Sequence, residues 1–297
     1  MPEKKRPDAE PDAQYVLGAD SLPQEGVPQG RVTQHTWESA HLFPGTVRDY
    51  WLYVPAQYDP KNPAGLMVYQ DGGRFVDSEG SFRTPSVADN LIHKGEMPVM
   101  LMLFVDPGTF PEGTAGAPIP NTQRSIEYDT LGDRYVRFLL DELIEPLRHQ
   151  YNLTDDPERW GIGGASSGAI AAWTAAWERP NTFRRVLSYI GSYTDIRGGH
   201  NYPPMIRKTP PRPIRIFMQS GRNDLNTKFG NWPLANHQMA SALEFAGYDY
   251  RFVFGEGRHS GVHGGAILPD ALRWLFREEK PKGLRAMFER AKKDLSS

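Results

Sequence analysis

A serine at the centre of a Gly-x-Ser-x-Gly motif is the residue of this sequence best placed to do chemistry. Residues 164–168 read Gly-Ala-Ser-Ser-Gly, with Ser166 in the middle. The short apolar run 159–163 predicts a buried strand, and the alanine-rich run 167–178 predicts a helix that ends before Pro180. Strand, sharp turn and helix are the context of a nucleophile elbow, which raises the serine hydroxyl above the sheet edge. We therefore predict Ser166 as a nucleophile, although glycine and serine also occur in ordinary turns.

A serine hydroxyl needs a base to take its proton and a carboxylate to orient that base. Two later loops offer these groups in the order serine, acid, histidine. Asp224 follows the predicted strand 214–219, and His259 follows the predicted strand 248–254. We therefore predict His259 as the base and Asp224 as its partner. Asp195, which follows an earlier predicted strand, is the alternative acid.

The anionic oxygen that forms when an ester carbonyl is attacked needs two hydrogen-bond donors already in position. The amide of Ser167, at the start of the predicted helix, is one expected donor. Gly73, to within one residue, is the other, because the glycine-rich turn after the predicted strand 65–69 lets the backbone approach a ligand. The same glycines are also compatible with a tight turn that has no catalytic role.

Four further side chains are candidates for substrate binding. Arg74, beside the proposed oxyanion turn, could meet a carboxylate, and Tyr193 and Trp232 are candidate aromatic walls. His263 is expected to line the pocket or to pack near the base. It follows His259 by four residues, but this segment lacks the glutamate of a zinc-binding His-Glu-x-x-His motif, so no metal site is predicted.

The elements that must position these residues predict one α/β domain. The 297 residues are 39% hydrophobic and 24% charged, which suits one sizeable core. Apolar runs suited to buried strands alternate with helical patterns from residue 31 to 280, which predicts a mostly parallel sheet with helices on both faces. An antiparallel pair of strands, separated by Pro44-Gly45, is expected at its N-terminal edge. We predict a disordered or draped tail over residues 1–30 and a single domain over residues 31–297.

The composition argues against several classes of partner. A formal net charge of −2 and a pI near 6.5 give no reason to expect binding to nucleic acid or to a membrane surface. No apolar run approaches the length of a transmembrane helix, and the N-terminus lacks the apolar segment of a secretory signal. The protein is therefore expected to be cytoplasmic, or periplasmic or secreted if a leader has been removed. The absence of cysteine excludes disulfides and thiolate catalysis.

Several segments together resemble the esterase D and enterochelin-esterase-like branch of the serine α/β-hydrolases, which also holds feruloyl and acetyl-xylan esterases and related acyltransferases. They are the turn 69–73, the elbow 164–168, the Gly257-Arg-His259 ending, and the Arg124-Ser-Ile-Glu127-Tyr128 segment. The resemblance implies an α/β-hydrolase fold and a serine esterase that works through an acyl-enzyme without a cofactor. The implied substrate is a small-molecule or glycan ester, either an acylated sugar or a hydroxycinnamoyl ester.

The sequence also departs from the family pattern. Ser260 and His263 stand where the family usually has Asp and Trp after the base. Enterochelin esterases carry a separate N-terminal domain, and the residues before the third predicted strand are too few for one. A siderophore or lactone esterase is therefore a second expectation rather than the first. An acyltransferase on the same triad and a catalytically silent ligand-binding module are two further possibilities, and the oligomeric state stays open.

Overall fold

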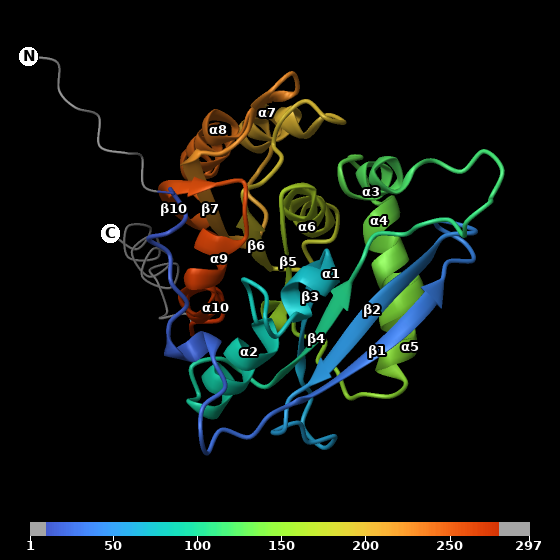
Figure 1. The fold of residues 1–297 in the computed structure, drawn as a ribbon, viewed down its shortest axis with the longest axis vertical. Coiled ribbons are helices and arrows are strands. Elements are labelled where there is room, and N and C mark those ends of the chain that lie inside the picture. The colour runs from blue at the N-terminus through green and yellow to red at the C-terminus, as the bar shows by residue number, and fades with distance from the viewer. Residues whose placement is uncertain (1–9, 279–297) are drawn as a thin grey trace, which may run out of the picture.

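Apolar strands form one eight-stranded sheet, in the order β1-β2-β4-β3-β5-β6-β7-β10 (Figure 1). The computed structural model describes residues 10–278. β2 runs antiparallel to β1 and β4, and the other neighbours are parallel, so the predicted antiparallel N-terminal edge is confirmed. The strands are β1 (Arg31–Glu38), β2 (Val47–Val54), β3 (Gly65–Gln70), β4 (Met100–Val105), β5 (Trp160–Ala165), β6 (Arg185–Tyr189), β7 (Arg215–Asn223) and β10 (Asp249–Arg258), with a small hairpin of β8 (Asn226–Thr227) and β9 (Gly230–Asn231).

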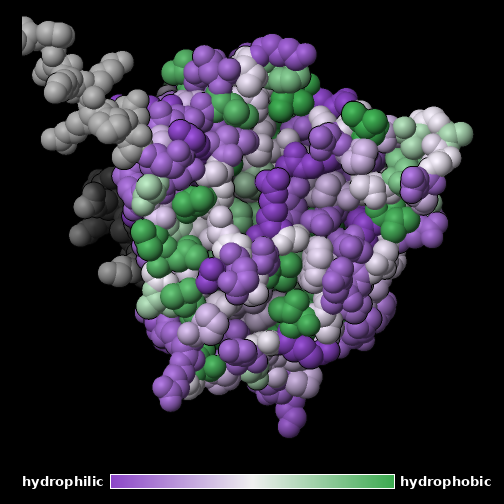
Figure 2. Space-filling view, in the orientation of Figure 1, coloured by the Kyte–Doolittle hydropathy of each residue, from purple (hydrophilic) through white to green (hydrophobic). Residues whose placement is uncertain are grey.

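Helices cover both faces of the sheet because successive strand residues point to opposite sides. Leu66 and Val68 of β3 lie in one core cluster, and Met67 and Tyr69 lie in the other. Hydrophilic side chains dominate the outer face that carries α1 and α3 (Figure 2). Among residues 10–278, no helix is both long and apolar enough to cross a membrane. The helices are α1 (Gly72–Val76), α2 (Thr84–His93), α3 (Pro120–Tyr128), α4 (Arg134–Arg137), a π-helical segment (Phe138–Ile144), α5 (Glu145–Arg148), α6 (Ser167–Glu178), α7 (Tyr202–Lys208), α8 (Trp232–Phe245), α9 (Val262–Ala266) and α10 (Leu268–Leu275).

The apolar rhythm of residues 128–151 predicts one long helix, and this prediction is wrong at its N-terminal end. Tyr128 ends α3, and α4, the π-helical segment and α5 together cover residues 134–148. Gly132, with a φ of 115°, lies in the intervening turn, and only glycine adopts this conformation readily. The proline and glycine content of residues 192–213 predicts a polar loop, but this segment also contains a helix, α7. The charged C-terminal tail that the sequence predicts to be helical lies outside the described residues.

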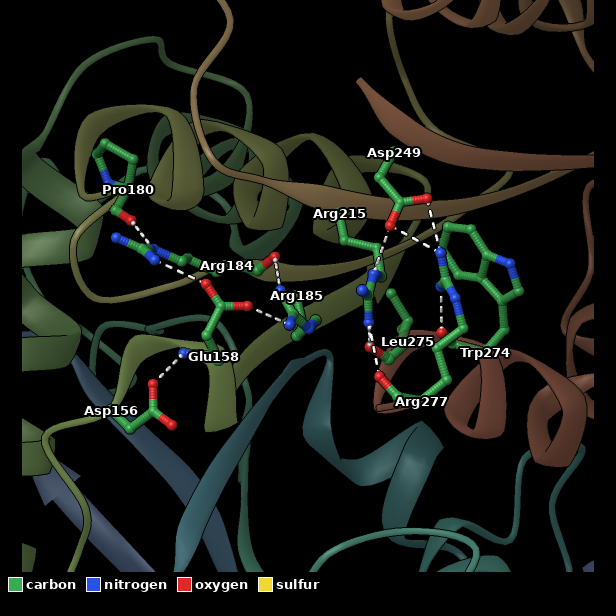
Figure 3. Close-up of polar contacts among 10 residues, drawn as sticks. All are labelled: Asp156, Glu158, Pro180, Arg184, Arg185, Arg215, Asp249, Trp274, Leu275 and Arg277. Carbon is green, nitrogen blue, oxygen red and sulfur yellow. Dashed lines mark hydrogen bonds and ion pairs between the residues drawn. The ribbon is translucent and has the colours of Figure 1, made fainter. Parts of the chain in front are cut away.

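Buried arginines at the amino-terminal ends of β6 and β7 are neutralised by carboxylates (Figure 3). Arg185 contacts Glu158, and Arg215 Nε donates to Asp249 Oδ2 at 2.7 Å. Burial alone would raise the pKa of Asp249, but hydrogen bonds from Arg215 and Arg277 hold it below its ordinary value. These charged pairs lie at the amino-terminal edge of the parallel strands, and the loops predicted to carry Asp224 and His259 follow the opposite, carboxyl-terminal edge.

Residues 10–30 form a segment with defined contacts, which we call the N-terminal strap. The sequence alone predicts a disordered or draped tail here. In Figure 1 the strap runs past β10, α9 and α10 towards α2. Asn90 Nδ2 donates to the carbonyls of Asp20 and Leu22 at 2.9 Å each. Hydrogen bonds from Lys94 and Arg273 lower the pKa of Asp20 to about 2, and these contacts anchor the strap on α2 and α10.

Candidate active site

The predicted elbow connects β5 to α6. Ser166 has a φ of 59° and a ψ of −122°, a conformation that is strained for a residue with a side chain. Gly164 is required by close packing, since a Cβ there would lie 2.5 Å from the backbone of Gly168. The Ser166 amide donates to the Tyr189 carbonyl at 2.9 Å, which ties the turn to β6. The neighbouring elements thus hold the strained turn and present the Ser166 hydroxyl at the carboxyl edge of the sheet.

The three residues predicted to form a triad meet at this edge. His259 Nε2 lies 2.8 Å from Ser166 Oγ, and His259 Nδ1 lies 2.5 Å from Asp224 Oδ1. The Asp224 side chain is 0% exposed, and its Oδ1 also accepts the Leu225 amide at 2.7 Å. In the tautomer with hydrogen on Nδ1, His259 donates to Asp224 and offers Nε2 to the serine proton. The arrangement can therefore remove a proton from Ser166 during attack on a carbonyl.

The alternative acid, Asp195, has a different partner. Its carboxylate Oδ1 lies 3.1 Å from His200 Nδ1, and its side chain is 72% exposed. An exposed carboxylate of this kind is screened by water and orients its partner weakly. The geometry therefore favours Asp224 over Asp195 as the residue that holds His259.

A second hydroxyl, which the sequence motifs do not single out, lies beside the hydroxyl of Ser166. Ser192 Oγ is 3.2 Å from Ser166 Oγ and accepts Trp232 Nε1 at 3.2 Å. Because an indole can only donate, the Ser192 hydroxyl can in turn donate to Ser166 Oγ. The Trp232 ring also packs edge-on against His259, with centroids 5.8 Å apart. The available sequence signal was the position of Ser192 just after β6, at the same sheet edge as Ser166.

Ser192→Ala is expected to lower kcat for an activated ester by about tenfold, because it removes one hydrogen bond to the reacting oxygen. Trp232→Phe keeps most of the ring but loses the N–H, so a smaller loss in the same direction is expected. Steady-state kinetics with p-nitrophenyl acetate measure both effects. An unchanged kcat in both variants would show that Ser192 only fills space beside Ser166.

The two predicted oxyanion donors have different surroundings. Ser167 begins α6, where the first amides have no acceptor within the helix and favour an anion. The Gly73 amide instead donates to Asp106 Oδ1 at 2.9 Å. Burial raises the pKa of Asp106, and the nearby charges of Asp71 and Asp49 add to this effect. Asp106 follows β4 and reaches the turn, so the Gly73 amide is not a free donor in this structure. Gly73 could donate to an oxyanion only if its hydrogen bond to Asp106 were released.

Ser166 and His259 border a cavity of about 520 Å³. Arg124 is fixed in its wall by two hydrogen bonds to Asp71, at 2.7 and 2.6 Å. Arg74 is exposed at the wall, and its positive charge partly offsets the rise in the pKa of Asp106. The outer face around α1 and α3 is correspondingly hydrophilic (Figure 2). The remaining lining residues are Asp77, Gly80, Ser81, Phe82, Asn121, Ala165, Ile190, Ser260 and Gly261.

Sequence comparison assigns the chain to a family. Residues 44–250 match the model of the Esterase family, described as "Putative esterase". The chain belongs to the Esterase family. A related sequence, the iron(III) enterobactin esterase of Dickeya dadantii, is 26% identical over 267 residues. That match covers 85% of this chain and 56% of the relative, so the chain spans little more than half of the relative's length.

Solved structures share the fold of this Esterase family member. The enterobactin esterase from Shigella flexneri, solved in the presence of enterobactin, superposes with a TM-score of 0.68 at 19% identity, over 86% of this chain and 62% of that one. A ferulic acid esterase from Anaeromyces mucronatus, in complex with ferulic acid, gives a TM-score of 0.69 at 15% identity, over 89% and 97% of the chains. The predicted α/β-hydrolase fold and the resemblance to the enterochelin-esterase-like branch are confirmed.

Of the four residues predicted to bind substrate, only the arginine reaches the cavity of this esterase-family chain. Tyr193 is buried, and its hydroxyl lies 2.8 Å from Ser188 Oγ. Trp232 is buried, and its ring packs against the His259 imidazole. His263 is also buried, and its Nδ1 accepts Gln219 Nε2 at 3.0 Å, while burial lowers its pKa. Neighbouring elements cover these rings, so the rings do not face the cavity. Sequence alone does not reveal which way such a ring faces.

Proposed function

We propose that this chain hydrolyses carboxylic esters through an acyl-enzyme on Ser166. The observation that carries the proposal is the hydrogen-bonded series from Asp224 through His259 to Ser166, with distances of 2.5 and 2.8 Å. Membership of the Esterase family supports the same chemistry. The strained backbone of Ser166 adds support, because such conformations cluster at active sites, where the surrounding structure enforces them.

In the acylation step, Ser166 Oγ attacks the carbonyl carbon while His259 Nε2 takes its proton. Asp224 stabilises the imidazolium that results. The carbonyl oxygen becomes anionic near the start of α6, where the Ser167 amide is the proposed donor. Collapse of the tetrahedral intermediate breaks the ester bond, and His259 returns the proton to the leaving alcohol. The products of this step are a free alcohol and an acyl-Ser166 ester.

In the deacylation step, water replaces the alcohol beside His259. The imidazole takes a proton from the water, whose oxygen attacks the acyl carbon. The second tetrahedral intermediate expels Ser166 Oγ, which recovers its proton from His259. Water thus ends in the released carboxylic acid, and the residues return to their starting protonation states.

We propose that the preferred substrate is an ester with a polar acyl or alcohol group, because charged side chains line the wall of the cavity. Arg74, Arg124 and Asp77 border it, together with Asn121. Such a lining hydrogen-bonds hydroxyl-rich or anionic groups better than it solvates a long alkyl chain. An acylated sugar or a hydroxycinnamoyl ester fits this description.

A trilactone siderophore is the second candidate substrate. It is favoured by the similarity to the Dickeya protein named as an iron(III) enterobactin esterase and by the Shigella structure solved with enterobactin. A substrate panel separates the candidates: methyl ferulate, an acetylated xylo-oligosaccharide, enterobactin, and p-nitrophenyl acetate and palmitate. We expect turnover of the acetate and of at least one polar ester, with little turnover of the palmitate. No turnover of any ester would favour a silent binding module, and net transfer to an added alcohol would favour an acyltransferase.

Arg74→Gln is expected to raise KM about tenfold for an ester that carries a carboxylate, such as mono-p-nitrophenyl succinate, because a charge-assisted hydrogen bond is lost. The KM for neutral p-nitrophenyl acetate should stay unchanged. Arg137→Gln, which removes an exposed arginine beside Asp141, is the matched control. Equal KM values for the anionic ester in both variants would exclude Arg74 from substrate binding.

A further inference from the structure

The loop that carries His259 receives support from outside the sheet. Among residues 10–278, β10 is the edge strand of the sheet and pairs with β7 on one side. On its other side the backbone N–H and C=O groups of β10 face no neighbouring strand. The ladder with β7 also shifts register between Gly255 and Arg258, just before His259. The parallel sheet therefore holds this loop less completely than β5 and α6 hold the nucleophile.

The N-terminal strap supplies acceptors at this free edge. The Glu256 amide donates to the Tyr15 hydroxyl at 2.8 Å, and the Arg258 amide donates to Asp12 Oδ1 at 2.9 Å. Ser260 Oγ donates to the second carboxylate oxygen of Asp12 at 2.7 Å. One carboxylate therefore binds the residue before His259 and the residue after it.

The loop is shaped to receive the strap. The Tyr15 ring stacks on His263 with centroids 3.8 Å apart and planes 7° apart. A Cβ on Gly255 would lie 2.2 Å from the Tyr15 hydroxyl, and a Cβ on Gly257 would lie 3.3 Å from Asp12 Oδ1. Glycine at position 255 is thus needed for the strap to approach the backbone of the loop. The Asp20 anchor on α2 and α10 fixes the far end of this stretch.

We infer that Asp12 and Tyr15 are positioning residues for the general base. By holding residues 256–260 they keep His259 Nε2 within reach of Ser166 Oγ. Neither residue lies against the reacting atoms, so they act through His259. A displacement of the base by about 1 Å can cost on the order of a hundredfold in rate. The inference rests on the proposed function of Ser166 and His259.

The test compares Asp12→Ala and Tyr15→Phe with Gln14→Ala, an exposed strap residue whose side chain donates to the Pro11 carbonyl. The readouts are the rate at which a fluorophosphonate probe labels Ser166 and the kcat and KM for p-nitrophenyl acetate. We expect Asp12→Ala to lower the labelling rate and kcat by about tenfold or more with little change in KM. Tyr15→Phe keeps the stacked ring and should give a smaller loss, and Gln14→Ala should match the wild type.

Two measurements separate positioning from a general loss of structure. Asp12→Asn retains an acceptor for the Arg258 amide and should restore part of the rate. The downfield proton resonance of the His259 Nδ1–H···Asp224 hydrogen bond should shift or broaden in Asp12→Ala, in protein that remains folded. Wild-type labelling per folded molecule in Asp12→Ala and Tyr15→Phe would overturn the inference. Failure of the wild type to label at Ser166 would instead contradict the proposed function.

Discussion

Ser166→Ala is expected to lower kcat/KM for p-nitrophenyl acetate by about a millionfold, to the level of residual catalysis by the rest of the site. The loss is this large because alanine cannot form the acyl-enzyme. No other hydroxyl can replace Ser166, since in the described part of the chain it is the Ser166 hydroxyl that hydrogen-bonds His259 Nε2. His259→Ala should cost nearly as much, since the hydroxyl then keeps its proton. The double variant should be no worse than either single one, because the two residues act as a unit.

The comparison measures kcat/KM by steady-state kinetics, in a stopped or continuous assay of p-nitrophenol release. Ser167→Ala keeps the backbone amide next to the nucleophile and serves as the control for disturbance of the elbow. If Ser166→Ala retained most of the wild-type kcat/KM, the acyl-enzyme mechanism would have to be abandoned.

Asp224→Asn is expected to lower kcat by about ten-thousandfold while leaving the fold intact. The side-chain amide of the new asparagine can donate to His259 Nδ1, which would place the imidazole hydrogen on Nε2. A protonated Nε2 cannot accept the proton of Ser166. The charge that stabilises the imidazolium is also lost. KM should change little, because Asp224 is buried behind the histidine and does not line the cavity.

Asp195→Asn is the matched control for Asp224→Asn. It removes a carboxylate from the exposed pair with His200 and should leave kcat near the wild-type value. A large loss in Asp195→Asn with little loss in Asp224→Asn would reverse the assignment of the acid. Circular dichroism on both variants checks that any difference arises in the site and not from unfolding.

The parts of the site that sequence could predict depend on short patterns. A strand, a glycine-flanked serine and an alanine-rich helix are contiguous, so the elbow of Ser166 follows from local sequence. Asp224 and His259 follow strand ends, and parallel strands bring those ends to one edge whatever the details of packing. The alternation of apolar runs with helical patterns predicts the sheet, and the two runs separated by Pro44-Gly45 predict its antiparallel edge.

The parts that sequence could not predict depend on contacts between distant residues. Asp12 and Arg258 are 246 positions apart, and the polar composition of the strap gave no sign of their hydrogen bond. Asp106 reaches the Gly73 amide only because β4 lies beside β3. Likewise, Tyr193 is aromatic in sequence, but whether its ring faces the cavity or the core is decided by packing. A residue type thus predicts chemistry better than it predicts which surface a side chain meets.

The most direct test of the central claim is to trap the acyl group. The protein is mixed rapidly with p-nitrophenyl acetate, quenched in acid and analysed by peptide mass spectrometry. Our account predicts one acetyl group, on the peptide that contains Ser166, formed with a burst of p-nitrophenol and absent in His259→Ala. Turnover of the ester with Ser166 unmodified, or an acetyl group carried by another residue at the rate of turnover, would contradict it.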